Sequence, residues 1–518
     1  MTTTLADQDA PPARARIPGT RTLVLSLIAL CLSELLVVMD NTIVNVAIPT
    51  FGRELNASTT QLQWIVDAYT LAFASLLLPA GYLGDRIGRK RILLAGLVGF
   101  GGFSVVSALV TTLGHITAMR TLLGVAAAMI FPATLSLITT TFHGSRLKGM
   151  AVGIWAATSG IGIALGPILG GLLLKHYSWP SIFWINLPIA AVSIAAIALV
   201  VPESRSRLSG HFDILGALAS ISAVAFLVWA IIEGPHKGWT SAPVLIAFVV
   251  SVVAFVGLVW WGLVCKAPLI DMTLFRRREF SAGALAISIA FFGLFGFIFV
   301  ITVFFQAIRG YSALGAGVAT LPFAVVMASL SPFATMLARR IGAGWVVGGG
   351  LAVMASGFYI VTTVAADCSY WGAVVPAMSL MAAGLAMVQG PATDALMDTA
   401  PLARAGSASA INDTTREVGG TLGVAVLGSV VASVFSSRLT DLLAGLHLPA
   451  QILEPAKSSA MAAMAVADQV PAQFAGPLRA ATSSAFMSAL HQASWVAVGV
   501  AACGAVVAFV TLPRRRAT

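Results

Sequence analysis

Long apolar stretches, separated by short polar segments, follow one another along almost the whole chain. A helix needs about 20 consecutive apolar residues to cross the hydrocarbon core of a bilayer. Measured against that length, the chain is predicted to be an all-α polytopic membrane protein with 14 transmembrane helices. They are expected near 22–48, 61–83, 91–112, 116–140, 150–174, 182–201, 213–233, 243–265, 280–306, 313–338, 344–364, 371–396, 405–436 and 490–512.

The composition supports this interpretation. Of the 518 residues, 58% are hydrophobic and 10% are charged, whereas soluble domains carry about 25% charged residues. No soluble domain is therefore expected. The sequence also lacks a Gly-x-x-x-x-Gly-Lys phosphate loop. We expect neither an enzyme nor a nucleotide-driven pump.

The positions of the basic residues predict the orientation of the chain. Lys and Arg are more frequent in cytoplasmic loops than in outer loops. With the N-terminus inside, 21 of them fall in predicted cytoplasmic segments and seven in outer segments, while Arg120 and Arg416 lie within spans. This bias predicts a multi-pass protein of a bacterial cytoplasmic membrane with both termini cytoplasmic. It also explains the net charge of +10 without a nucleic-acid partner.

A weak internal similarity divides the chain into two halves. The segment "GYLGDRIGRKRIL" at 81–93 resembles "ATMLARRIGAGWVV" at 334–347, so spans 1–6 match spans 9–14. Parallel halves around a central cavity are typical of transporters. The predicted parts are a cytoplasmic tail (1–21), a six-helix bundle (22–201), an inserted helix pair (213–265) and a second six-helix bundle (280–512). The second bundle includes an outer loop at 437–489, for which we expect short amphipathic helices.

The segment "GYLGDRIGRK" resembles the cytoplasmic loop motif of the major facilitator superfamily. The matching residues are Gly81, Leu83, Gly84, Asp85, Arg86, Gly88, Arg89 and Lys90. The resemblance implies a fold of two six-helix bundles, and a loop that closes the cytoplasmic side when the cavity faces outward. A basic loop that only fixes orientation is the alternative, although an acid and three glycines exceed what orientation requires.

Further segments resemble the 14-helix drug:proton antiporter branch of that superfamily. They are "MDNTIVNVAIP" at 39–49, "WIVDAYTL" at 64–71, "RTLLGVAAA" at 120–128 and "RAGSASAINDTTREVGGTLG" at 404–423. In that branch two helices are inserted between the bundles. The resemblance covers about residues 22–436 and the last span. The resemblance identifies the branch specifically, but it says much less about which substrate is transported.

"GIGIALGPILGG" at 160–171 resembles the antiporter motif of span 5 in this branch. Gly162, Gly166 and Gly170 recur every fourth residue and so share one helix face, which permits close helix packing. Pro167 removes a backbone hydrogen bond and bends the helix; Gly171 completes the motif. The resemblance implies a hinge that also limits proton leak, while packing alone is the alternative.

Charged residues inside the spans are the candidate sites for proton coupling and substrate charge. An ionised carboxylate in hydrocarbon costs about 2.5–3.5 kcal/mol on insertion scales, so such groups normally face the bundle interior or a wet cavity. A carboxyl that takes up a proton outside and releases it inside couples export to the proton gradient. A cationic substrate can compete for the same site. The candidates are Glu34, Asp40, Asp67, Asp394, Asp413 and Glu417, with Arg120.

Asp40 is the first candidate for the proton-responsive site, with Arg120 tuning it; holding helices 1 and 4 together is the alternative. Glu34, about 120° around the helix from Asp40, is either a determinant of substrate charge or a tolerated, protonated acid. Asp413 and Glu417 share one helix face, and Arg416 follows Asp413 as its neutralising neighbour.

Two further acids are candidates, Asp67 at an outer depth similar to that of Asp40 and Asp394 near the other side of the membrane. Asp67 is either an attractor of cations near the outer exit or a solvated acid at a helix end. Asp394, near the cytoplasmic end of span 12, is best explained as structural. Aromatic residues could line an apolar drug cavity, although packing or lipid contact is the simpler explanation for each. They include Trp64, Tyr69, Trp155, Phe291, Phe292, Phe295 and Phe297.

The sequence thus predicts a proton-coupled antiporter that exports lipophilic, cationic drugs or biocides across the cytoplasmic membrane. The alternatives are a dedicated exporter of one metabolite or antibiotic and, from another class, a non-transporting membrane sensor. We expect protons as the coupling ion, and neither a cofactor nor a metal. The expected partners are small lipophilic or cationic molecules and the lipid bilayer, and the protein is expected to be a monomer.

Overall fold

The computed structural model describes residues 19–55, 57–206, 211–444 and 450–513, and within these ranges every regular element is helical. Fourteen of the described helical segments are long and apolar enough to cross a membrane. The prediction of an all-α chain with 14 membrane-spanning helices is therefore confirmed. The predicted tail 1–21 lies outside the described residues except for 19–21, as do 514–518.

The described residues of the first half of the chain and of the inserted pair form nine helices. They are α1 (Thr20–Glu54), α2 (Thr59–Ile87), α3 (Arg89–Leu109), α4 (Leu113–Thr141), α5 (Lys148–His176), α6 (Ser181–Trp184), α7 (Asn186–Val200), α8 (Ile214–Lys237) and α9 (Ala242–Val264).

The second half begins after a short 3-10 turn, η2 (Met272–Arg276). Its elements are α10 (Arg278–Val303), η3 (Phe304–Ile308), α11 (Ala313–Ala319), α12 (Leu321–Ile341), α13 (Ala343–Val361), η4 (Tyr370–Val374), α14 (Val375–Thr399), η5 (Leu402–Arg404), α15 (Ala405–Leu443), α16 (Ala450–Lys457), α17 (Ala460–Ala467) and α18 (Ala472–Thr511).

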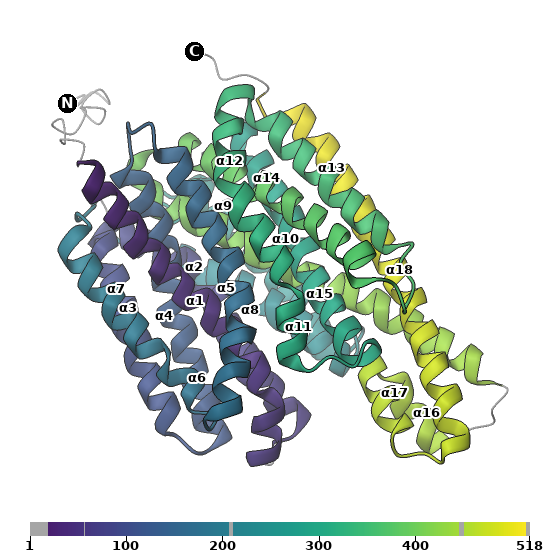
Figure 1. Cartoon of the computed structure of the whole chain (residues 1–518). Helices are drawn as coiled ribbons and strands as arrows, with labels where there is room; N and C mark the ends of the chain where they lie inside the picture. Colours follow the sequence, from purple (N-terminus) through teal and green to yellow (C-terminus); the bar gives the residue numbers. More distant parts are fainter. Residues whose placement is uncertain (1–18, 56, 207–210, 445–449, 514–518) are drawn as a thin grey trace, which may run out of the picture.

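The helices pack as two bundles side by side (Figure 1). In the first, α1 packs on α5, α2 on α4, and α3 on α4 and α7; in the second, α10 packs on α15, α12 on α14, and α13 on α14 and α18. Helices α5 with α12, and α2 with α15, join the bundles. The start of α1 and the end of α18 lie at the same end of the molecule, which we call the predicted cytoplasmic end.

Local sequence signals fix the ends of α2. The Ser58 hydroxyl accepts a hydrogen bond from the Gln61 backbone N–H, and the Gln61 side chain accepts one from the Ser58 N–H, which is a capping box. At the other end, Gly88 has φ +129°, a conformation that favours glycine. Gly88 ends α2 and precedes Arg89, the first residue of α3.

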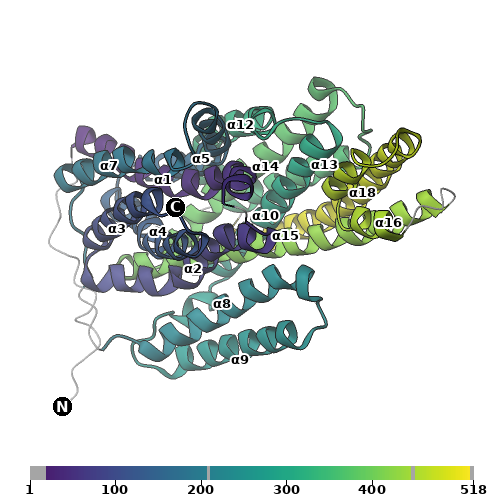
Figure 2. The same ribbon diagram turned by 90° about the horizontal axis from the view of Figure 1, so that it is seen from below.

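The inserted helices α8 and α9 lie beside the two bundles rather than within them (Figure 2). They pack on each other, and α8 also contacts α2 and α15. The carboxylate of Asp213 caps α8 at the Gly216 N–H (2.9 Å) and accepts hydrogen bonds from Trp261 Nε1 and the Leu269 N–H (both 2.8 Å). One buried acid therefore fastens the start of α8 to the end of α9 and the segment that follows.

The segment predicted as an outer loop is largely helical. Helix α15 continues to Leu443 and α18 begins at Ala472, with α16 and α17 between them; 445–449 lie outside the described residues. A prediction from apolar length ends a span where the sequence becomes polar. The helix itself can continue beyond that point wherever the residues have good helix propensity, and this segment is rich in alanine. Both helices therefore extend past the predicted span ends at 436 and 490.

Candidate functional site

A buried group of charged residues lies where the two bundles meet. Glu34 of α1 is fully buried and accepts a hydrogen bond from the Ser159 hydroxyl of α5. The Ser159 Oγ in turn accepts a hydrogen bond from Nη2 of Arg416 in α15, at 3.1 Å. One serine thus links an acid of the first bundle to a cation of the second.

Two further acids flank Arg416 on its own helix. Asp413 is buried and forms an ion pair with Arg416 at 3.8 Å, as its position three residues earlier predicts. Its Oδ1 also accepts a hydrogen bond from the side chain of Asn412 at 2.9 Å. Glu417 is partly buried and lies within electrostatic range of Arg416. We call Glu34, Asp413, Glu417 and Arg416 the central cluster.

The central cluster has an excess of acidic groups. If its three carboxyls were all ionised beside one guanidinium, it would carry a net charge of −2. An uncompensated buried charge costs several kcal/mol, so protons stabilise this arrangement. Within the described residues, Glu34 Oε2 and Asp413 Oδ2 have no hydrogen-bond partner. Buried polar atoms are normally paired, and these two oxygens are positioned to take a proton or contact a ligand.

Asp40 and Arg120 form a separate ion pair inside the first bundle, in which both Asp40 oxygens accept hydrogen bonds while Arg120 Nη2 has no hydrogen-bond partner within the described residues. Both are fully buried, and Arg120 Nη1 donates to Asp40 Oδ2 at 2.6 Å. Asp40 Oδ1 accepts from Asn186 Nδ2 of α7 at 2.7 Å, and Arg120 Nε donates to the Ile65 carbonyl of α2 at 3.1 Å. The Arg120 guanidinium also lies 4.2 Å from the centre of the Tyr69 ring. These contacts join α1, α2, α4 and α7.

The remaining two predicted acids have other neighbours. Asp67 of α2 is partly exposed, and its electrostatic neighbour is Glu233 of the inserted helix α8. Asp394 of α14 accepts two hydrogen bonds from Arg339 of α12, at 2.8 and 2.7 Å. This bidentate pair lies within the second bundle and agrees with the structural explanation of Asp394.

The Asp85 carboxylate connects the bundles at the predicted cytoplasmic end. Its Oδ1 accepts from the Gly406 N–H and its Oδ2 from the Ser407 N–H, both at 2.8 Å, and the Ser407 hydroxyl adds a bond of 3.0 Å. Gly406 and Ser407 lie in the first turn of α15, where free N–H groups and the helix dipole favour an anion. Arg89 donates to Asp85 Oδ1 at 2.6 Å and to the Leu402 carbonyl at 2.8 Å. We call these five residues the latch.

The other predicted gate residues support this contact or lie around it. A Cβ built on Gly81 would lie 2.5 Å from the carbonyl oxygen of Gly406, so only glycine allows α2 to approach α15 this closely. Gly84 is not crowded in this way. Arg86 lies 5.5 Å from the centre of the Tyr82 ring, and Lys90 Nζ donates to the Ala198 carbonyl at 2.8 Å.

A second contact between the bundles at the predicted cytoplasmic end was not predicted from the sequence. Lys148, at the start of α5, forms an ion pair with Asp398, near the end of α14. It adds to the latch at the same end of the molecule. A sequence pattern could not have found it, because the two residues are 250 positions apart and belong to no motif.

The glycines of the span 5 motif bring α5 against α1. A Cβ on Gly162 would lie 2.8 Å from Cβ of Val38, and one on Gly170 would lie 2.9 Å from Cγ1 of Ile43. A Cβ on Gly166 would collide with the Thr42 side chain. The predicted glycine face therefore packs on the helix that carries Glu34 and Asp40. Pro167 and Gly171 instead face Gly317 and Leu314 of α11.

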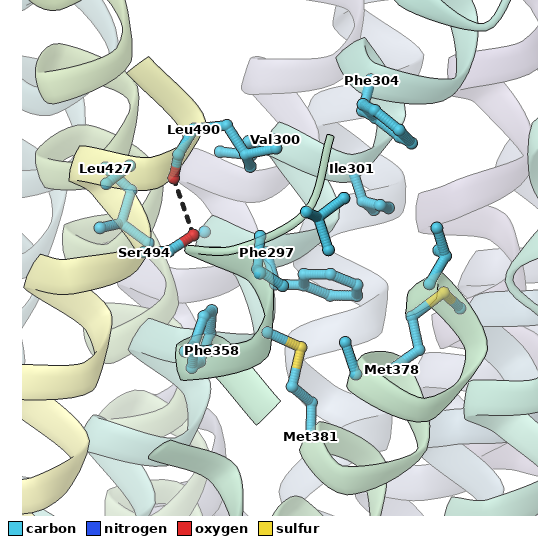
Figure 3. A pocket seen from close by; sticks show the side chains of 16 residues that line it. Phe297, Val300, Ile301, Phe304, Phe358, Met378, Met381, Leu427, Leu490 and Ser494 are labelled. Atoms are coloured by element: carbon cyan, nitrogen blue, oxygen red, sulfur yellow. Dashed lines mark hydrogen bonds between the residues drawn. The ribbon is translucent and has the colours of Figure 1, made fainter. Parts of the chain in front are cut away.

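A small cavity lies inside the second bundle (Figure 3), and its lining residues are uncharged. It measures about 30 Å³ and is lined by apolar side chains, among them Phe297, Phe358, Met378 and Met381. The hydroxyl of Ser494 at its wall donates to the Leu490 carbonyl of its own helix at 2.7 Å. Room for about two waters is too little for a drug-sized ligand, which normally occupies about 300 Å³ or more.

Comparison with known proteins identifies the relatives of this chain. The family model "Major Facilitator Superfamily" matches residues 30–424. The multidrug efflux pump LfrA of Mycolicibacterium smegmatis is 34% identical over 98% of this chain and 99% of its own length. The methyl viologen resistance protein SmvA of Salmonella typhimurium is 36% identical over 86% and 90%. The tetracenomycin C resistance and export protein of Streptomyces glaucescens is 33% identical over 94% and 91%.

Solved structures support the same fold. A bacterial homolog of the human lysosomal transporter Spinster, crystallised in an inward-facing and unoccupied conformation, aligns with a TM-score of 0.56 at 16% identity. The alignment covers 95% of this chain and 98% of that one. At this identity the likeness concerns the fold alone.

Proposed function

Since the chain belongs to the Major Facilitator Superfamily, we propose that it exports lipophilic, cationic small molecules from the cell in exchange for protons. The protein is a multi-pass membrane protein. We further propose a bacterial cytoplasmic membrane, both termini in the cytoplasm, and a monomer that needs neither cofactor nor metal and catalyses no reaction. Relatives named as a multidrug efflux pump and a methyl viologen resistance protein support this substrate class.

The observation that carries the proposal is the central cluster. Three acids surround one guanidinium, and two carboxylate oxygens have no partner within the described residues. Such a cluster can hold protons or the positive charge of a substrate, but the same oxygens cannot hold both. Export then follows from the exchange: protons loaded from outside displace the cation, and the next cation displaces the protons to the inside.

The position of the cluster couples this exchange to movement of the bundles. Ser159 bonds to Glu34 within the first bundle and to Arg416 of the second. Any change of charge on Glu34 therefore alters a contact that crosses the boundary along which the bundles rock. At the predicted cytoplasmic end, the latch and the Lys148–Asp398 pair hold the bundles together. We propose that both contacts break when that end opens to load a substrate.

Asp40 receives a different role within this proposal. Its carboxylate already accepts hydrogen bonds from Arg120 and Asn186, and its contacts lie within the first bundle. We propose that it holds α1 against α4, the alternative that the sequence left open. The proton-coupling role then moves to Glu34, Asp413 and Glu417. We propose Asp67 as an attractor of cations beside the inserted pair.

The relatives also support a second candidate function. The tetracenomycin C resistance and export protein covers almost the same length, so a dedicated exporter of one metabolite or antibiotic uses the same framework. A dedicated exporter would select its substrate by hydrogen bonds and shape, and would export few unrelated cations. A non-transporting sensor would bind compounds without moving them.

One experiment separates these candidates. Purified protein is reconstituted into liposomes, and ethidium transport is followed under an imposed pH gradient, with and without a protonophore. A proton-driven exporter of cations transports ethidium only while the gradient lasts. A transport rate that the protonophore does not change would contradict proton coupling. If the protein transports none of ethidium, tetraphenylphosphonium and methyl viologen, the dedicated exporter is favoured. Binding of these cations without flux would favour the sensor.

A further inference from the structure

The guanidinium of Arg416 sits among three aromatic rings. Its central carbon lies 4.5 Å from the ring centre of Phe291, 5.0 Å from that of Phe131 and 5.3 Å from that of Trp155. All three distances fall within the range of about 6 Å in which a cation is attracted to a ring face. We call Phe131, Trp155 and Phe291 the aromatic cage.

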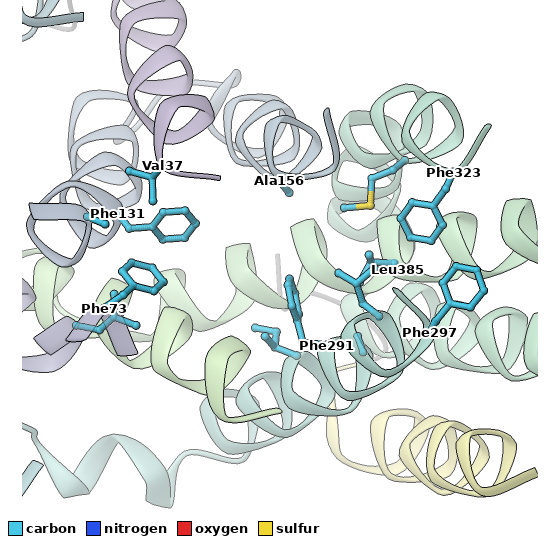
Figure 4. Packing of buried hydrophobic residues seen from close by; sticks show 14 of the residues in the cluster. Val37, Phe73, Phe131, Ala156, Phe291, Phe297, Phe323 and Leu385 are labelled. Carbon is cyan, nitrogen blue, oxygen red and sulfur yellow. The ribbon is translucent and has the colours of Figure 1, made fainter. Parts of the chain in front are cut away.

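The aromatic cage is built from residues of both bundles. Phe131 comes from α4, Trp155 from α5 and Phe291 from α10, and Figure 4 shows Phe131 and Phe291 in the packed interior of the molecule. Trp155 is fully buried, and its indole N–H donates to the Thr134 hydroxyl at 3.1 Å. The Phe131 and Trp155 rings also meet edge to face at 5.9 Å. Phe131 and Trp155 are therefore positioned by contacts that do not involve Arg416, and Phe291 packs on the ring of Phe295 at 5.9 Å.

Hydrogen bonds hold Arg416 only loosely. Nη2 donates to Ser159, but Nε and Nη1 have no hydrogen-bond partner within the described residues, and the nearest Asp413 oxygen is 3.8 Å away. A guanidinium carries five N–H donors in a fixed plane, and a buried one normally satisfies them. The contacts between the guanidinium and the three rings therefore contribute much of the interaction that holds the Arg416 side chain in this position.

We infer that Arg416 occupies the aromatic cage as an internal cation, and that a lipophilic cationic substrate binds by displacing its guanidinium from the cage. This inference rests on the proposed function and specifies the site at which the cargo binds. The cage offers the rings that a quaternary or aromatic cation prefers. The oxygens of Glu34 and Asp413 that have no partner among the described residues lie in the same buried cluster and supply the opposite charge.

The displacement also links binding to the motion of the bundles. A guanidinium that leaves the cage loses its hydrogen bond to Ser159, the contact between α15 and α5. The long arginine side chain can still neutralise Asp413 and Glu417 on its own helix. Binding of the substrate therefore breaks the Arg416–Ser159 contact between the bundles. Part of the binding free energy compensates for the loss of that contact.

The inference makes a prediction about coupling between two residues. In the wild-type protein the Arg416 guanidinium already fills the cage, so Phe291→Leu weakens the binding of the substrate and of this guanidinium alike. In an Arg416→Gln protein the guanidinium is absent, and the same change weakens only the binding of the substrate. The loss of affinity caused by Phe291→Leu is therefore larger in the Arg416→Gln background. If Arg416 merely repelled cations by its charge, the two effects would be independent.

The test is the affinity of full-length protein in nanodiscs for tetraphenylphosphonium, measured by titration calorimetry. The variants are Arg416→Gln, Phe291→Leu and the double variant. Arg416→Gln is expected to tighten binding about tenfold, and Phe291→Leu to weaken it about tenfold in the Arg416→Gln protein but less than threefold in the wild type. Arg309→Gln, which removes a positive charge from a loop arginine bound to the Ala366 carbonyl, is the matched control and should leave the affinity unchanged.

The outcomes separate the inference from the proposed function. Additive effects of the two substitutions, or weaker binding by Arg416→Gln, would overturn displacement from the cage while leaving cation export intact. No binding of tetraphenylphosphonium by any folded protein of the set would instead overturn the proposed substrate class. If Arg416→Gln does not fold, Arg416→Met removes the charge with an apolar side chain in its place and is used in the same cycle. Phe131→Leu provides a second cycle of the same design.

Discussion

Glu34 and Arg416, which belong to different bundles, share one hydrogen-bond partner, the hydroxyl of Ser159. The hydroxyl has a single proton, and it donates that proton to Glu34 while its oxygen accepts from Arg416. A protonated Glu34 would have an O–H of its own to donate, so the direction of this hydrogen bond could reverse. The protonation state of Glu34 therefore affects the hydrogen bonds of Ser159 at the boundary between the bundles.

Glu34→Gln is expected to abolish most of the gradient-driven transport without unfolding the protein. Glutamine keeps the size of the side chain and an oxygen for the Ser159 hydroxyl, but it cannot bind or release a proton. We expect the rate of ethidium transport under a pH gradient to fall about tenfold or more, which corresponds to about 1.4 kcal/mol. Glu279→Gln, at an exposed glutamate in the first turn of α10, is the control and should transport normally.

Asp40→Asn is expected to act mainly on stability. The change leaves the buried Arg120 without its charged partner, and breaking a buried ion pair in this way costs about 3–5 kcal/mol. The unfolding temperature in detergent should fall clearly, and the double variant Asp40→Asn with Arg120→Gln should recover part of the loss. An Asp40→Asn protein of normal stability that has lost proton coupling would return the proton-responsive role to Asp40.

Loosening the latch is expected to open the predicted cytoplasmic end. Asp85→Asn removes the negative charge at the start of α15, and hydrogen bonds to a charged group contribute about 1.5–3 kcal/mol each. The measurement is the distance between spin labels at the exposed positions Arg146 and Arg340, after replacement of the four free cysteines. We expect longer distances in Asp85→Asn and a smaller shift in Ser407→Ala; unchanged distributions in both would contradict a latch.

The glycine face of α5 is expected to tolerate no added methyl group at its centre. Gly166→Ala would place Cβ against the Thr42 side chain and force α1 and α5 apart, which should lower both the unfolding temperature and transport. Gly102→Ala in α3 is the matched control, because a Cβ there meets nothing within 4 Å. An alanine in a helix is favoured over glycine by about 0.5–1 kcal/mol, so the control should be neutral or slightly stabilising. Equal behaviour of the two variants would contradict tight packing at this face.

The sequence predicted the parts of the fold that hydrophobicity and motifs determine. The number of spans follows from apolar length, and the close approach of α5 follows from three glycines on one face. The Asp413–Arg416 ion pair follows from their spacing on one helix. The pairing of Asp40 with Arg120 agrees with the expectation that these two residues interact.

The centre of the site could not be predicted from the same signals. Glu34, Ser159 and Arg416 come from three helices far apart in the sequence, and a serine in a glycine-rich helix looks like any other small residue. Likewise, no sequence pattern around Phe131 distinguishes a residue of the aromatic cage from one that only packs in the interior. The helical extensions of α15 and α18 were missed because the apolar criterion measures membrane depth, whereas a helix continues until its backbone is interrupted.

The account depends most on the exchange of protons for cargo at the central cluster. The direct measurement adds tetraphenylphosphonium to purified protein in weakly buffered solution near neutral pH and records released protons with a pH indicator. We predict proton release on binding by the wild type, and none by a variant that combines Glu34→Gln, Asp413→Asn and Glu417→Gln. Calorimetric binding of the cation by the wild type without any release of protons would contradict the account.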